Sequence, residues 1–451
     1  VWEQIDQSLS GFTELQENGK FALQGAGVIV DNKTNYVVAI VGGRGTEDKF
    51  NRAYLSARQP GSTIKPLIDY GPAFDTGEYY PTRIVNDHKW EDGPSNSGGR
   101  YFGNVTVREA LNRSLNTVAW QILEDIGVNY GLDYLGEMQF QKLTYVDNDV
   151  PSLSIGGFTN GVRVVDMAKG YSTLANGGVY NDRTCITKIV HEHDGELTKD
   201  LKPSAHQVYR DDSAFMLTDV LKGTFTAAYG TGQGLGLDND MPAAGKTGTT
   251  NSSKDTWFCG YTRYYTAAIW VGYDIPRNMP GIYGATYAGR IWKSVMDQIH
   301  QGLEPWDWVQ PETVERKVDS KTGMEDYFST TAQFRAEQSL HEKEQEQLET
   351  SLQASVDAFM EKEITSVEDT YTVTDEYNSI TSKLPLLDDG ELRASLLEKA
   401  ESRYDYFKEI IASMGDEISR YEAVQAEEKR LAQEQAAKDA ENKRAQEEKN
   451  V

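Results

Sequence analysis

Strand-like runs at the two ends of the first 310 residues constrain the fold of this chain most. Residues 24–30 and 36–41 are two β-rich runs joined by a polar turn, which is a hairpin pattern. Three further short runs come much later in the chain, at 245–250, 256–262 and 266–273. Helical patterns fill the sequence between the two groups. We therefore expect an α/β (α+β) fold with a central antiparallel sheet of about five strands, assembled from both ends of one domain and flanked by helices.

The intervening helices have recognisable ends. Thr106 and Glu109 form a capping-box pair at the start of a helix whose apolar face continues toward Gly127. A second helix follows Gly156-Gly157 and stops at Asn176-Gly177-Gly178. Both early strands are nearly continuous in apolar residues, so we expect the sheet to be covered on both faces.

The composition changes sharply after Trp306-Asp307-Trp308, and we place a domain boundary near residue 310. Residues 1–20 are interpreted as the end of an interdomain linker, and residues 21–310 as the main domain. Residues 311–451 form an acidic tail, partly solvated, for which we expect a helical hairpin or a coiled coil. Its apolar positions alternate steps of three and four, which is a heptad seam, at Leu397, Ala400, Tyr404, Phe407, Ile411, Met414, Ile418 and Tyr421.

Charge, cysteine and histidine content exclude several classes of function. The formal net charge of −25 argues against nucleic-acid binding, which needs a basic surface. Cys185 and Cys259 are too few for a disulfide framework and are interpreted as buried small apolar side chains. His191 and His193 fit a solvated turn better than a metal site, and no metal or cofactor is implied.

The sequence gives no sign of a membrane span. No apolar run approaches the roughly 20 residues that a spanning helix needs. The first residues, Val1-Trp2-Glu3, are not a signal peptide. The protein is therefore either cytosolic, or a leader and an anchor lie outside the given chain.

A hydroxyl nucleophile and an amine base follow a Pro-Gly turn. Ser62 and Lys65 are three residues apart, so they share a face if a helix starts at Pro60-Gly61. A helix start also has backbone N–H groups without internal partners, which favours an alkoxide or an oxyanion near Ser62. Pro66 opposes a regular helix, because it cannot donate to the carbonyl of Ser62, but proline is tolerated near a first helical turn.

Two further motifs accompany this pair, although a Ser-x-x-Lys pattern alone occurs by chance in a chain of this length. Ser114-Leu115-Asn116 lies inside the capped helix, where it interrupts the apolar face. Lys246-Thr247-Gly248-Thr249 lies on a predicted strand, and Gly248 lets a ligand approach the strand edge closely. A second copy of the triplet, Lys321-Thr322-Gly323, lies in a polar segment and is interpreted as accidental.

The order of these three motifs resembles that of the penicillin-binding proteins and serine β-lactamases. The resemblance is to the transpeptidase domain of class A, or bifunctional, penicillin-binding proteins, and it covers residues 21–308. The other segments that carry it are Phe50-Asn51-Arg52-Ala53, Arg58-Gln59-Pro60-Gly61-Ser62, Gly156-Gly157-Phe158-Thr159-Asn160-Gly161, Ala175-Asn176-Gly177-Gly178 and Asp255-Thr256-Trp257-Phe258. The glycosyltransferase domain and membrane anchor that such proteins carry upstream would lie outside this chain.

The resemblance implies a D,D-transpeptidase that cross-links peptidoglycan stem peptides through a serine acyl-enzyme. Ser62 would attack the penultimate carbonyl of a D-Ala-D-Ala end, Lys65 would accept the proton, and Ser114 would relay a proton to the departing amine. The backbone N–H groups of Ser62 and Thr249 would form the oxyanion hole. The substrate-binding residues would be Asn116, Lys246, Thr247, Gly248 and Thr249. Burial and the charge of Lys246 would lower the pKa of Lys65 from about 10.4, so that the amine can act as a base.

Partners, location and alternatives follow from the same resemblance. The expected partners are the D-Ala-D-Ala donor, an amine acceptor on a neighbouring strand and β-lactam antibiotics, and the tail could recruit a coiled-coil or cell-wall partner. The expected location is the cell-wall side of the cytoplasmic membrane. One alternative is a D,D-carboxypeptidase or β-lactamase, in which water replaces the acceptor amine. A more remote one is a non-catalytic scaffold of cell-wall synthesis, against which the presence of all three motifs argues.

Overall fold

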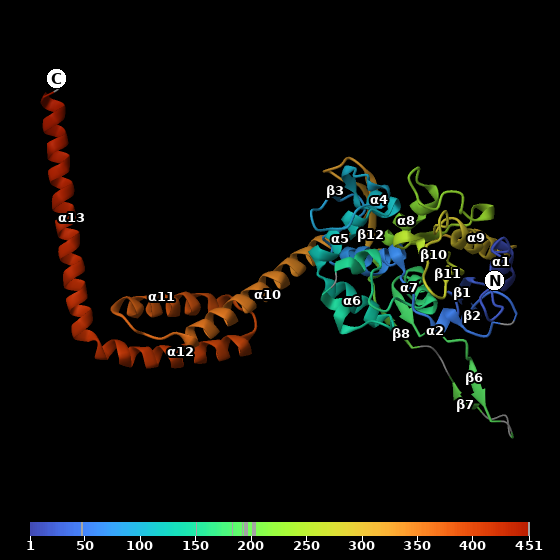
Figure 1. Ribbon diagram of the computed structural model, residues 1–451, viewed down its shortest axis with the longest axis horizontal. Coiled ribbons are helices and arrows are strands. Elements are labelled where there is room, and N and C mark those ends of the chain that lie inside the picture. The colour runs from blue at the N-terminus through green and yellow to red at the C-terminus, as the bar shows by residue number, and fades with distance from the viewer. Residues whose placement is uncertain are drawn as a thin grey trace. The chain divides into compact units, whose positions relative to one another are not determined.

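A five-stranded antiparallel sheet forms the centre of the first of two compact units in this chain (Figure 1). In the computed structural model these units are Val1–Ala336 and Glu337–Val451. The structure describes residues 1–46, 48–149, 151–182, 184–191, 193, 197–200 and 204–449.

The sheet joins strands from both ends of the first unit, as the sequence predicts. Its strand order is β2, β1, β11, β10, β9. In that order the strands span Val37–Val41, Leu23–Asp31, Tyr265–Tyr273, Asp255–Tyr261 and Ala244–Thr249. The central pair, β1 and β11, stays in one register from Leu23 opposite Tyr273 to Asp31 opposite Tyr265.

Helices cover both faces of the sheet. Helices α1 (Trp2–Ser8) and α9 (Tyr287–Ile299) pack on one face, and α7 (Val164–Ala175) and α8 (Asp211–Thr226) pack on the other (Figure 1). Side chains of β11 alternate between the two resulting cores, as the period of a strand requires. Strand β1 is buried almost throughout, whereas β2 at the sheet edge is half-buried to exposed. Of the two early strands, the predicted double coverage therefore holds for β1 alone.

The chain between β2 and β9 contains most of the helices of the first unit. Its shorter helices are α2 (Arg52–Leu55), α3 (Gly71–Asp75), α4 (Val107–Arg113), α5 (Asn116–Ile126) and α6 (Val128–Glu137). The predicted cap forms, since the side chain of Thr106 accepts a hydrogen bond from the N–H of Glu109. The helix predicted up to Gly127 is divided into α4 and α5, because Ser114 adopts a left-handed backbone with φ 60°.

Short antiparallel strand pairs lie outside the central sheet. They are β3 (Ile84–Asp87) with β4 (Gly103–Thr106), β5 (Val179–Asn181) with β8 (Ala205–Gln207), and β6 (Lys188–Val190) with β7 (Leu197–Asp200). Cys185 is exposed and Cys259 is buried, and both are free thiols, so the expected burial holds for Cys259 only. The polar stretch with His191 and His193 lies partly outside the described residues.

Residues beyond the predicted boundary near 310 pack with the first unit. Strands β12 (Val314–Val318) and β13 (Glu325–Ser329) pair antiparallel, and β13 contacts α8. Arg108 on α4 donates to the carboxylate of Asp326 on β13 at 2.7 Å. The compact unit therefore extends to Ala336, while the functional division of the chain at 310 stays a prediction.

The second unit consists of helices around a core of its own. They are α10 (Ala332–Glu361), whose first turn still belongs to the first unit, α11 (Val367–Lys383), α12 (Gly390–Ser413) and α13 (Gly415–Lys449). The core is formed by Leu352, Val356, Phe359, Val373, Ile380, Leu384, Leu387, Leu396, Ala400 and Phe407. No helix in the described part of the chain combines the length and the apolar character needed to cross a bilayer.

The predicted heptad seam does not follow one continuous helix. It is interrupted at Met414, where α12 ends and α13 begins. Ala400 and Phe407 of the seam lie in the core of the second unit. Beyond Tyr421, the side chains of α13 that the structure describes are exposed. The first part of the seam is therefore used for packing within the tail itself.

Candidate active site

The segment that carries the predicted nucleophile is helical but irregular. Gly61–Thr63 forms a 3-10 turn and Pro66–Tyr70 a π-type turn ahead of α3. The proline lacks the N–H that would normally bond the carbonyl of Ser62, so the regular helix is lost here. The next carbonyl, that of Thr63, accepts a hydrogen bond from the Tyr171 hydroxyl at 2.7 Å. A helical segment thus forms at the predicted place, with the distortion that the proline imposes.

Lys65 reaches the turn between α4 and α5. Its Nζ donates to the carbonyls of Ser114 at 2.9 Å and Leu115 at 3.2 Å. It also donates to Asn116 Oδ1 at 2.8 Å. Among the described residues, no hydrogen bond joins Lys65 Nζ to Ser62 Oγ. The amine of Lys65, from the first motif, therefore contacts the second motif, Ser114-Leu115-Asn116.

The second amine of the site comes from β9. Lys246 Nζ donates to Ser114 Oγ at 2.8 Å and to the carbonyl of Thr247 at 3.2 Å. Ser114 therefore lies between two lysines, with its carbonyl bound to Lys65 and its hydroxyl bound to Lys246. Both lysines are fully buried. The three sequence motifs, far apart in the chain, meet in one site.

Two glycines let β9 lie directly against the turn Gly61–Thr63, which we call the nucleophile turn after the predicted role of Ser62. Gly61 has φ +52°, and a Cβ there would lie 3.0 Å from the carbonyl oxygen of Thr249. A Cβ on Gly248 would lie 2.6 Å from the carbonyl oxygen of Pro60. The absence of a side chain at Gly248 thus admits the protein's own backbone, and the approach of a ligand to this strand edge stays a prediction.

The threonines of the third motif have polar partners of their own. Thr247 Oγ1 is hydrogen bonded to Thr231 Oγ1 at 2.7 Å. Thr249 Oγ1 accepts from the N–H of Gly284 at 3.0 Å. The second Lys-Thr-Gly triplet, residues 321–323, lies in the turn between β12 and β13 and so belongs to a different sheet.

Sequence reasoning missed the polar support of Asn116. Its backbone N–H donates to Asn96 Oδ1 at 2.7 Å, and Asn96 Nδ2 donates to Asp87 Oδ1 at 2.7 Å. Its side-chain Nδ2 donates to the carbonyl of Ser95 at 2.9 Å. Ser95 and Asn96 lie between β3 and β4, in a stretch whose composition shows only that it is rich in turn formers. Its contact with α5 becomes visible only in the folded chain.

Burial controls the charge of both lysines. It lowers the pKa of Lys65 to about 7, because the charged amine loses its hydration, and a charged Asp69 would oppose this shift. The pKa of Lys246 is lowered well below its usual range by burial and by the charge of Lys65. The charge of each amine disfavours the charge of the other, so the pair holds two protons poorly.

A buried carboxyl group follows Lys65 in the same helical segment. Asp69 is fully buried, and neither of its carboxyl oxygens has a hydrogen-bond partner among the described residues. Burial raises the pKa of Asp69 well above its usual value, which favours the neutral acid. A neutral Asp69 leaves the lowered pKa of Lys65 unopposed.

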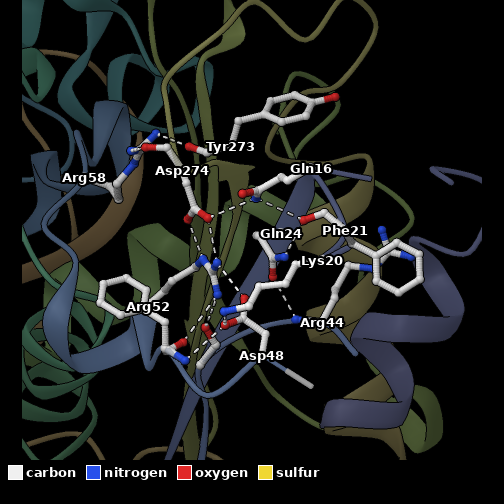
Figure 2. A network of polar contacts seen from close by, with 12 residues as sticks. Gln16, Lys20, Phe21, Gln24, Arg44, Asp48, Arg52, Arg58, Tyr273 and Asp274 are labelled. Atoms are coloured by element: carbon white, nitrogen blue, oxygen red, sulfur yellow. Dashed lines mark hydrogen bonds and ion pairs between the residues drawn. The ribbon is translucent and has the colours of Figure 1, made fainter. Parts of the chain in front are cut away.

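Arginine side chains tie the segment before the nucleophile turn to the end of the sheet. Arg58 Nε donates to Asp255 Oδ1 at 2.7 Å. Its other guanidinium nitrogens donate to the carbonyls of Tyr273 at 2.8 Å and Asp274 at 3.0 Å. Figure 2 shows Arg58 beside Asp274, whose carboxylate Arg52 binds through two nitrogens. Such two-point pairs fix orientation as well as charge, so the segment is anchored in a defined position.

Known proteins are similar to this unit in sequence and in fold. The model of the penicillin binding protein transpeptidase domain matches residues 25–297, more than half of the chain. The chain belongs to this transpeptidase family. Among curated penicillin-binding proteins, penicillin-binding protein 1A of Clostridium botulinum is 34% identical over 311 residues, 65% of this chain and 37% of that protein. Penicillin-binding protein 4 of Bacillus subtilis is 31% identical over 303 residues, 66% of this chain and 48% of that protein. The chain thus spans less than half the length of these two penicillin-binding proteins.

Solved penicillin-binding proteins have the same fold. Penicillin-binding protein 1A from Haemophilus influenzae matches with a TM-score of 0.61 and 23% identity, over 71% of this chain and 56% of that one. The PonA1 protein from Mycobacterium tuberculosis, solved in complex with penicillin V, matches with a TM-score of 0.58 and 23% identity, over 72% of this chain and 88% of that one. The predicted family and the predicted transpeptidase-like fold, with its five-stranded antiparallel sheet and helical extension, are confirmed.

The lowered pKa of Lys65 can be measured directly. In the full chain labelled with ¹³C at lysine Cε, we expect the Lys65 resonance to titrate near a pH of about 7. Free lysine titrates near about 10.4, so the resonances of Lys65 and Lys246, whose pKa is lowered as well, should stand apart from those of the other lysines. Lys65→Met should remove the Lys65 resonance, and Lys321→Met, which changes an exposed-loop lysine, should leave it in place. A spectrum without a lysine resonance titrating between about pH 6 and 8 would contradict the burial argument.

Proposed function

We propose that this chain carries a D,D-transpeptidase of peptidoglycan synthesis that works through an acyl-enzyme on Ser62. The observation that carries the proposal is the convergence of three separate motifs on one buried site. Lys65 binds Asn116 from the second motif. Lys246 from the third motif binds Ser114. Membership of the transpeptidase family, and the penicillin V complex of the similar PonA1 structure, support the same activity.

In the first half-reaction the hydroxyl of Ser62 attacks the penultimate carbonyl of a D-Ala-D-Ala end. The O–H bond breaks, its proton passes to the neutral amine of Lys65, and an Oγ–C bond forms. Collapse of the tetrahedral intermediate breaks the amide C–N bond. The terminal D-Ala leaves as an amine and takes the proton held by Lys65, relayed through the hydroxyl of Ser114. Lys65 is then neutral again, and the donor peptide stays on Ser62 as an ester.

In the second half-reaction an amine of a neighbouring strand attacks this ester. Its surplus proton passes to Lys65, the Oγ–C bond breaks, and the proton returns to Ser62 as the new amide forms. The sequence has no motif that supplies a carboxylate for hydrolysis, so an acyl group without an acceptor amine should persist. This explains why a β-lactam, whose strained amide mimics the donor, would block the site.

The base must be neutral when it accepts the proton. A pKa of about 7 makes a large fraction of Lys65 neutral at neutral pH. A neutral amine donates only two hydrogens and keeps a lone pair, whereas Lys65 Nζ has three acceptors around it. A neutral Lys65 must therefore give up one of these contacts, and the longest, 3.2 Å to Leu115, is lost at the least cost.

Oxyanion and carboxylate binding are assigned to the contact between β9 and the nucleophile turn. The backbone of Gly61 lies against that of Thr249. This contact supports the assignment of the N–H groups of Ser62 and Thr249 as the oxyanion donors. Losing one such donor typically costs about 2.7–4 kcal/mol of transition-state stabilisation. Lys246, with Thr247 and Thr249, would bind the terminal carboxylate of the substrate. An incoming carboxylate favours the protonated amine, so substrate binding restores the charge that burial removes from Lys246.

The site lies in a unit whose substrates would be outside the cytoplasmic membrane. We therefore place the working enzyme on the cell-wall side, with stem peptides as donor and acceptor and β-lactams as inhibitors. A coiled-coil or cell-wall partner for the tail stays a prediction.

Ser62→Ala is expected to abolish covalent labelling by a fluorescent penicillin, because no acyl-enzyme forms without the hydroxyl oxygen. Ser56→Ala removes a nearby serine hydroxyl at the end of α2 and is the matched control, which should label like the wild type. Mass spectrometry of the intact chain should find the added penicillin on the wild type and the control only. Undiminished labelling of Ser62→Ala would refute the assignment of the nucleophile.

The chain contains its own control for Lys246. Lys246→Met should lower the second-order rate constant of acylation about hundredfold or more, because it removes the cation that pairs with the substrate carboxylate. Lys321→Met makes the same change in the second Lys-Thr-Gly triplet and should leave the rate constant unchanged. Equal rate constants in both variants would contradict the role of β9 in carboxylate binding.

Product analysis separates the transpeptidase from a D,D-carboxypeptidase or a β-lactamase-like hydrolase. A stem peptide is incubated with the full chain, with and without an added acceptor amine. We expect released D-Ala to be accompanied by an amide product that appears only with the amine, because the persistent ester waits for a nitrogen nucleophile. Release of D-Ala with hydrolysed peptide alone, at any amine concentration, would favour the carboxypeptidase.

A further inference from the structure

The side chain of Gln59, shortly before Ser62, is bound to the backbone of a single distant residue. Gln59 Nε2 donates to the carbonyl of Phe158 at 2.6 Å, and the N–H of Phe158 donates to Gln59 Oε1 at 2.9 Å. The backbone carbonyl of Gln59 accepts from Trp257 Nε1 on β10 at 2.8 Å. Residues 58–62 are called the nucleophile segment here. Gln59 thus connects this segment both to the sheet and to the loop of residues 156–162.

That loop lies along the nucleophile segment without room for side chains between them. Arg58 and Val162 exchange two backbone hydrogen bonds, each 2.9 Å long. A Cβ on Gly161 would lie 2.6 Å from the backbone of Arg58. A Cβ on Gly156, where φ is +88°, would lie 2.4 Å from the backbone nitrogen of Gly61, the residue before the nucleophile. A shift of the loop would therefore shift the residue that precedes Ser62.

We propose that Gln59 is a positioning residue for acylation, which clamps loop 156–162 onto the nucleophile segment and so holds Ser62 against β9. The inference rests on the proposed function of Ser62 and adds to it a residue that touches no reacting atom. A carboxamide suits this task because it carries a donor and an acceptor side by side, and so pairs with the N–H and C=O of one residue. A carboxylate only accepts, and it would set one of its oxygens against the carbonyl of Phe158.

The clamp is needed because of the composition of the loop. Gly156, Gly157 and Gly161 give its backbone many accessible conformations, and the side-chain contacts of Gln59 select one of them. Without the clamp the loop would move, and Ser62 would lose its alignment with the oxyanion donors. A displacement of about 1 Å at a reacting group can lower a rate about hundredfold.

Gln24 on β1 offers a matched control of the same chemistry. Its Nε2 donates to the carbonyl of Phe21 at 2.6 Å, and its Oε1 accepts from the N–H of Arg44 at 2.8 Å, as Figure 2 shows. Both glutamines therefore join backbone groups through the same donor and acceptor. In the described part of the chain, no hydrogen bond links Gln24 to residues 58–62.

The test compares Gln59→Glu with Gln24→Glu in the full chain, using acylation by a fluorescent penicillin. We measure the acylation rate constant at saturation, the half-saturating concentration, the labelled fraction at completion and the unfolding temperature. Gln59→Glu should lower the saturating rate constant about ten- to hundredfold with complete labelling at the end and little change in half-saturation. Gln24→Glu should lower the unfolding temperature at least as much and leave the rate constant within about twofold of the wild type.

Each other outcome has a defined meaning. A rate constant for Gln59→Glu equal to the wild type, or an equal loss in Gln24→Glu, overturns the positioning role. If Gln59→Glu does not fold, Gln59→Asn replaces it, because the shorter amide keeps both polar groups but cannot reach Phe158, and the same criteria apply. A wild-type chain that takes up no penicillin overturns the proposed function itself, whereas a labelled wild type with an unaffected Gln59→Glu overturns only the clamp.

Discussion

The burial of two lysine amines in one site determines how the rest of the first unit is built. Two positive charges that share a poorly solvated space repel strongly, so the pair gives up a proton easily. Ser114 supplies an oxygen to each amine, its carbonyl to Lys65 and its hydroxyl to Lys246. It can do so only because its backbone is left-handed, a conformation that costs roughly 1–2 kcal/mol for a residue other than glycine. The break between α4 and α5 is thus part of the site, since a continuous helix would turn that carbonyl along its own axis.

The nucleophile turn is confined from two sides by backbone instead of side chains. Strand β9 contacts it at Gly248, and the loop of residues 156–162 contacts it at Gly156. On each side a single methyl group would overlap main-chain atoms, so glycine is required for contact and not only for flexibility. Main-chain groups are well suited to such a place, because their N–H donors stay fixed while the carbonyl carbon of a substrate changes its geometry.

Sequence reasoning recovered the elements that have a strong periodic or motif pattern and missed those that depend on tertiary contacts. The five strands, the capped helix and the three motifs were predicted, because hydrophobic alternation, caps and reactive residue types are visible in one dimension. Strand β12 was missed because Val-Glu-Arg-Lys-Val, residues 314–318, shows no apolar alternation and is mostly exposed. The supports at Asn96 and Gln59 were missed because a polar side chain in a loop gives no sign of its partner. The break at Ser114 was visible only as an interruption of the apolar run.

The pairing of β1 with β11 also affects how the protein is made. Strand β1 lies near the start of the chain and is buried on nearly all of its length, yet its partner is synthesised only after the whole helical region. Pairing between such distant segments is slow, because a long loop must close before the strands gain their contacts. Until β11 has left the ribosome, the apolar surface of β1 remains open to wrong partners. Lys65 and Lys246 likewise lie far apart along the unfinished polypeptide, so the two amines come together at Ser114 only when β9 has joined the sheet.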